Sequence, residues 1–152
     1  MGATFQAYRR EYMSYTKDNI AYSAVSRFRG YLLTMLDEKN GTDWYRRWHW
    51  CCFEDSEHGG NGEWTALLDE MYRKVFLGDG PADDVVYGTM KFVDHSDCDG
   101  TWGSESCDAI AKAFSALLET DIVTDGHDRT RIEQMIAVFK DGAGEDCEVE
   151  II

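Results

Sequence analysis

Residues 105–118 repeat their apolar side chains at the spacing of one helix face, and this pattern constrains the fold more than any other. Positions three and four residues apart lie on the same side of an α-helix, so we predict a helix that buries this stripe. Ser104 is placed to cap its first turn. The stripe consists of Cys107, Ile110, Ala111, Phe114, Leu117 and Leu118.

The same spacing predicts further helices along the chain. It indicates a first helix over residues 4–15, a second over residues 21–40 with Asp18 or Asn19 as its cap, and a third over residues 64–75. A last helix is predicted to begin at Asp128 or Thr130. Asn40-Gly41 is a typical stop for the second helix.

The C-terminal residues 147–152 alternate apolar and acidic side chains, which is typical of a half-buried strand. A strand needs a partner, and the β-branched segment 85–93 is the nearest candidate. We therefore expect an α+β fold: a mostly α-helical single domain over residues 1–152, with four to six helices. A small antiparallel sheet or hairpin would include the C-terminal strand.

Composition narrows the class of protein. Hydrophobic residues make up 43% of the chain, which is enough for a core and argues against wholesale disorder. No apolar run approaches the length that spans a bilayer, and residues 1–15 lack the apolar core of a signal peptide. The five cysteines follow no framework spacing, which fits reduced thiols. These features predict a cytoplasmic protein without a membrane partner.

The net charge of −14 is concentrated in the second half of the chain. Residues 1–76 carry 10 basic and 11 acidic side chains, a net of −1, whereas residues 77–152 carry 5 and 18, a net of −13. Such a field disfavours direct binding to nucleic acid. A protein partner with a basic surface, a bound cation or solubility alone remain as explanations.

The segment from Asp94 to Gly100 concentrates carboxylates, an imidazole, a thiol and a hydroxyl immediately before the helix of residues 105–118. A calcium-binding EF-hand does not fit, because Ser106 stands where that loop requires glutamate. A different divalent-ion site remains open. Its candidate ligands are Asp94, His95, Asp97 and Asp99, with Glu105 as a further carboxylate.

Three other roles for this segment stay open. His95, Cys98 and Cys107 form a candidate soft-metal site, and Cys98 with His95 forms a candidate nucleophile–base pair. The third role is structural: the short acidic side chains cap backbone N–H groups while His95 and Cys107 pack inward.

Residues 44–53 form the most aromatic segment, WYRRWHWCCF, and their spacing fits a helix and a strand equally well. Trp, Tyr and Arg are the residues that dominate protein interfaces, so the segment is a candidate contact surface as well as a candidate core segment. A zinc site of His49, Cys51, Cys52 and His58 lacks the paired-cysteine spacing of structural sites. The glycine-rich loop 58–62 lacks the lysine of a phosphate-binding loop.

The hexapeptide His95-Ser96-Asp97-Cys98-Asp99-Gly100, followed by Cys107 and an Ile-Ala-x-x-Phe helix, resembles a motif of small uncharacterised bacterial and phage proteins. The strand-like ending at residues 145–151 occupies the same place as in those proteins. The resemblance covers roughly residues 91–152 and implies a bacterial or phage origin. It implies no catalytic residue.

The sequence leads us to expect an acidic, non-enzymatic binding protein that blocks a basic site on a protein partner. A host-defence protein that binds nucleic acid is the concrete example, through imitation of phosphate charge. The alternatives are a metal-binding small enzyme or ligand-binding protein centred on Asp94, His95, Asp97 and Asp99, and an assembly protein without a ligand. The residues predicted to contact a partner are Trp44, Arg46, Arg47, Trp48, Trp50, Asp83, Asp84, Asp121 and Asp125.

Overall fold

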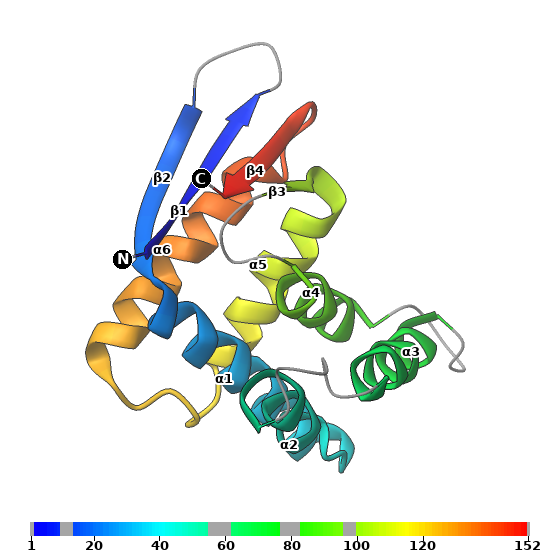
Figure 1. Cartoon of the computed structure of the whole chain (residues 1–152). Helices are drawn as coiled ribbons and strands as arrows, with labels where there is room; N and C mark the ends of the chain where they lie inside the picture. Colours follow the sequence, from blue (N-terminus) through cyan, green and yellow to red (C-terminus); the bar gives the residue numbers. More distant parts are fainter. Residues whose placement is uncertain (1, 10–13, 55–61, 77–82, 96–99, 152) are drawn as a thin grey trace.

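The computed structural model describes residues 2–9, 14–54, 62–76, 83–95 and 100–151 (Figure 1). The fold is α+β and mostly helical with a small antiparallel sheet, as predicted. The strands are β1 (Gly2–Arg9), β2 (Ser14–Ala21), β3 (Gly100–Gly103) and β4 (Cys147–Ile151). The helices are α1 (Tyr22–Asn40), α2 (Trp44–His49), the π-helix η1 (Trp50–Glu54), α3 (Glu63–Phe76), α4 (Asp84–Val93), α5 (Ser104–Leu118) and α6 (Gly126–Gly142).

The sheet has the order β2-β1-β4-β3, and every neighbouring pair is antiparallel. The predicted helix over residues 4–15 is wrong, because its described residues 4–9 and 14–15 lie in the antiparallel strands β1 and β2. Phe5 and Tyr8 fit helical spacing, but Ala3, Phe5 and Ala7 also recur with the period of two that a strand requires. Those three side chains are buried and the residues between them are not, so the sheet face decides the structure.

The predicted strand over residues 85–93 is also wrong, since this segment is α4. The Asp83 carboxylate accepts hydrogen bonds from the backbone N–H groups of Val85 and Val86 and starts a helix there. Val86, Met90 and Val93 then form a buried helical stripe. The C-terminal strand is confirmed, but it pairs with β1 and β3 instead.

The predicted helices elsewhere are confirmed, although three of their caps differ. Asp18 and Asn19 lie within β2, so α1 begins at Tyr22 with Ala21 before it. Ser104 is the first residue of α5 and not its cap, which is Gly103. α6 begins at Gly126, where the Asp125 side chain accepts a hydrogen bond from the Asp128 backbone N–H at 2.9 Å.

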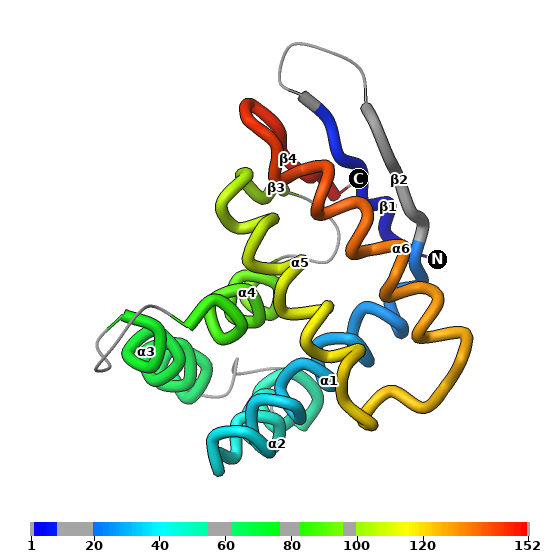
Figure 2. Tube along the Cα trace, turned by 180° about the vertical axis from the view of Figure 1, so that it is seen from behind, coloured from blue at the N-terminus to red at the C-terminus, as the bar shows by residue number. Residues whose placement is uncertain are grey.

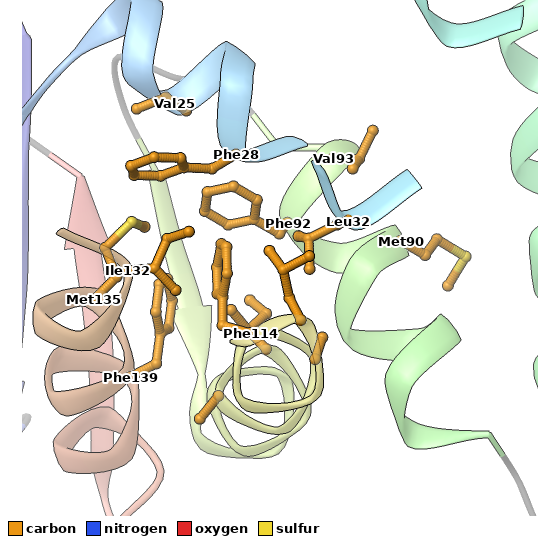
Figure 3. Close-up of a cluster of buried hydrophobic side chains, with 14 of the residues drawn as sticks. Val25, Phe28, Leu32, Met90, Phe92, Val93, Phe114, Ile132, Met135 and Phe139 are labelled. Carbon is orange, nitrogen blue, oxygen red and sulfur yellow. The ribbon is translucent and has the colours of Figure 1, made fainter. Parts of the chain in front are cut away.

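The buried side chains form one cluster between the sheet and the helices. α6 packs against β1, β2 and β4 on one side and against α5 on the other (Figure 2). Phenylalanines from four helices meet in the centre of the cluster, and the predicted stripes of α5 and α6 supply much of its surface (Figure 3). They are Phe28 of α1, Phe92 of α4, Phe114 of α5 and Phe139 of α6.

Within the described ranges, every helix is too short or too polar to traverse a bilayer.

Gly88 allows α4 to lie directly against α5. A Cβ atom at this position would lie 2.1 Å from the Ala109 carbonyl oxygen, so a side chain here forces the two helices apart. We predict that Gly88→Ala lowers the free energy of unfolding by about 1–3 kcal/mol, measured by urea denaturation. Gly126→Ala is the matched control, because nothing lies within 4 Å of its Cβ position. An equal loss in both variants would contradict this account.

Candidate functional site

His95, at the start of the predicted metal-binding motif, is held by the sheet. Its ring stacks on the Trp102 indole with centroids 3.8 Å apart, and its Nε2 lies 3.1 Å from the Thr101 carbonyl oxygen. Arg29 of α1 donates to the His95 carbonyl oxygen at 2.6 Å. These contacts favour the structural role of the imidazole, because they fasten the end of α4 to β3.

Gly100 completes this arrangement on the other side of the motif. Its φ of +104° lies in the region that favours glycine, and a Cβ atom would come within 2.8 Å of the His95 ring. The Trp102 carbonyl oxygen accepts from the Cys107 thiol at 3.4 Å, so the motif is also tied to the first turn of α5.

The metal hypothesis for this motif stays a prediction. Asp94 is exposed, and its Oδ1 accepts from the Trp64 indole N–H at 3.3 Å. Asp97, Asp99 and Cys98 lie outside the described residues. Burial raises the pKa of the Cys107 thiol to about 12, which disfavours the thiolate that a soft metal requires. Among the residues that the structure describes, no three His, Cys, Asp or Glu side chains gather as a metal site would need.

The backbone conformation of Gly100 and its closeness to His95 lead to a testable prediction, with Gly103 of the same strand as the comparison. Gly100→Ala should lower the free energy of unfolding by roughly 1–3 kcal/mol, because a positive φ is strained for alanine and the new methyl group meets the His95 ring. Gly103→Ala, at φ −70° with open space around it, should cost much less. Urea denaturation of both variants measures the difference, and equal stabilities would refute the proposed role of Gly100.

The aromatic segment 44–53 is helical, with α2 continuing into η1. Trp44 and Trp48 belong to the core, since their side chains are only 1% and 4% exposed. Of the three tryptophans predicted to contact a partner, Trp50 is the one that is accessible, at 37% exposure. Arg46 pairs with Asp43, and Arg47 pairs with Glu63 and Glu70. The predicted zinc ligand His58 lies outside the described residues.

Two of the four acidic residues predicted to contact a partner also cap helices. Asp83 and Asp125 cap α4 and α6, and Asp84 is bound by Lys112 at 3.2 Å. Asp121 is exposed in the connection between α5 and α6.

A cavity of about 440 Å³ lies between α1, α2, η1 and the α5–α6 connection. Its described walls are mainly aromatic. Trp48 and Phe53 meet edge to face with centroids 5.5 Å apart, and Tyr45 lies 5.9 Å from Trp48. The described lining residues are Ser26, Arg27, Gly30, Tyr31, Thr34, Tyr45, Trp48, His49, Phe53 and Ile122.

Two of the lining residues, Arg27 and Tyr31, belong to a polar group of three. The buried Asp128 carboxylate of α6 accepts from Arg27 Nε at 3.2 Å, from Arg27 Nη2 at 2.9 Å and from the Tyr31 hydroxyl at 2.7 Å. The Arg27 hydrogen bond, with Tyr31 adding to it, holds the pKa of Asp128 below its usual value. Burial and the same carboxylate raise the pKa of Tyr31.

The Asp128 interaction predicts a defined pH dependence. Because its pKa is lower in the folded chain than in the unfolded one, its stabilisation is complete above the ordinary pKa of about 4 and is lost as the pH falls through the folded value. We expect Asp128→Asn to cost about 1–2 kcal/mol at neutral pH, with a smaller difference from the wild type below about pH 4. Denaturant unfolding at a series of pH values measures this, and a difference independent of pH would contradict it.

Sequence patterns did not find the cavity. Its polar wall joins Arg27 to Asp128, which lie in α1 and α6 and share no local motif. Trp102 was also missed, because a four-residue strand between two glycines has no periodicity to detect. The aromatic composition of residues 44–53 was the one available indication, because four of the described lining residues lie in this segment.

Comparisons of the chain with models of protein families, with curated proteins and with solved structures found no match.

Proposed function

We propose that this chain is an acidic, non-enzymatic binding protein of a phage or bacterium that covers a basic site on a protein partner. A host-defence protein that binds nucleic acid is the example we favour, because a surface rich in carboxylates competes for the same cations as phosphate.

The observation that carries this proposal is the outward placement of the carboxylates in the second half of the chain. We call these exposed groups the acidic surface. It extends over α5, α6 and the segments that follow each of them. Its members are Glu105, Asp108, Glu119, Asp121, Asp125, Glu133, Asp141, Glu145 and Asp146.

The basic side chains of this half neutralise the acidic surface only in part. Lys112 lies 2.9 Å from Asp108 and 3.2 Å from Asp84, so it offsets charge at one end of α5. Arg129 instead donates to the carbonyl oxygens of Leu118 and Val123, where it closes the connection between α5 and α6. This half holds 5 basic and 18 acidic side chains, so a large net negative charge remains, which supports recognition of a positively charged partner.

Binding to a partner captured from nuclease-treated bacterial lysate tests this proposal. With the partner purified, the dissociation constant should rise steeply as salt increases from about 0.05 to 0.5 M, since salt screens exposed charges. The double variant Asp121→Asn/Glu133→Gln should weaken binding about 2- to 30-fold at low salt. Duplex DNA should compete with the chain if the partner binds nucleic acid.

The matched control removes the same charges from the near-neutral half. Asp69→Asn/Glu54→Gln changes two exposed carboxylates and should leave the affinity within about twofold of the wild type. Salt-independent binding would overturn the proposal, and so would an equal loss in both double variants.

A further inference from the structure

We propose that the cavity between α1, α2 and η1 binds an uncharged planar aromatic ring that carries a carbonyl acceptor on its edge. This inference concerns a second site. Nearly all described lining residues come from the near-neutral half of the chain, so it does not depend on the acidic surface.

The aromatic side chains in the walls of the cavity favour a flat, apolar ligand. About 440 Å³ is within the range of pockets that take small organic ligands. Phe53 supplies one wall and is 53% exposed, while Tyr45 is 40% exposed and Trp48 lies behind them at 4%. Such large exposed rings cost free energy in water, and a stacked ligand removes that cost. The ring pairs His49–Phe53 at 4.9 Å and Tyr45–His49 at 6.0 Å already show the spacing of aromatic contacts.

The wide turn of η1 carries Phe53, which lines the cavity. An α-helix continuing from α2 would set residue 53 at a different angle, because a π-helix has more residues per turn. Cys51 is buried under this turn while Phe53 faces its neighbours Trp48 and His49. The π-helix therefore builds one side of the aromatic wall.

The hydrogen-bond donors at the polar wall favour a ligand that carries a hydrogen-bond acceptor. Arg27 directs Nε and Nη2 to Asp128, and within the described ranges its Nη1 has no hydrogen-bond acceptor. The Ser26 hydroxyl likewise makes no hydrogen bond in the part of the chain that the structure describes. Asp128 and Tyr31 fix the guanidinium in place, so its remaining donors are oriented before a ligand arrives.

The polar wall and the net charge disfavour the two ionic alternatives. A cation needs acceptors or open ring faces, but Arg27 presents only N–H donors at this wall. A small anion would meet the long-range field of a chain with a net charge of −14, and Asp128 already neutralises Arg27. An uncharged ring with an acceptor avoids both penalties.

Protein-observed NMR titration of the full chain tests the inference. The ring probes are nicotinamide, indole-3-carboxamide and inosine, which represent a pyridine amide, an indole amide and a nucleoside. At least one should bind with a dissociation constant on the order of 1 mM or tighter and shift resonances of the cavity. The order of their affinities identifies the ring source. Benzyltrimethylammonium and cyclohexanecarboxamide are the cationic and non-aromatic comparisons, and both should bind more weakly.

Two pairs of measurements locate the ligand. Phe53→Ala should weaken the best probe about tenfold, whereas Phe76→Ala, which removes a ring of similar exposure from α3, should leave it within twofold. Indole-3-carboxamide should bind more tightly than indole to the wild type, and Arg27→Gln should abolish that preference. Because this second readout is a ratio, a general loss of stability does not produce it.

Failure of every ring probe to bind, tighter binding of the cation, equal binding of the non-aromatic amide, or equal losses in Phe53→Ala and Phe76→Ala would each overturn the proposal. None of these results bears on the acidic surface, which is tested with a separate partner.

Discussion

The packing around Trp102 fixes the rest of the structure. Its indole lies 5.9 Å from the rings of Phe5 and Phe92 and 5.3 Å from that of Phe139, and its N–H donates to the Lys91 carbonyl oxygen. One side chain of a four-residue strand thus joins β1, α4 and α6. The His95 ring covers its remaining face. Since α5 begins directly after β3, the position of this indole also sets where α5 enters the core.

The sequence was sufficient for elements whose apolar residues follow one period, and insufficient where two periods compete or where residues distant in the chain meet. The stripes of α1, α3, α5 and α6 and the alternation of β4 predicted those elements correctly. The apolar residues of 4–15 suggested a helix, and pairing of β1 with both β2 and β4 selects the strand. In α4, a capping aspartate outweighed β-branched residues. The Arg27–Asp128 ion pair joins side chains of α1 and α6 that lie 101 residues apart in the chain, which no local pattern encodes.

The two halves of the chain offer different chemistry to their surroundings. The second half places carboxylates on the outside of α5 and α6, where they act through long-range charge. The first half places aromatic rings around a cavity, where they act through contact. Arg27 and Asp128 link the two, because each half contributes one partner to the same ion pair. The chain therefore combines an aromatic cavity with a surface rich in carboxylates.

The position of β1 has a consequence for how the chain acquires its structure. Its outer neighbour β2 follows immediately, but its other neighbour is β4, which pairs Phe5 with Ile151. During synthesis the edge of β1 that pairs with β4 stays without its strand partner until β4 is made. β3 also meets the sheet only through β4. Closure of the sheet is therefore a late, long-range event, which slows folding and leaves a nascent edge that a chaperone is suited to shield.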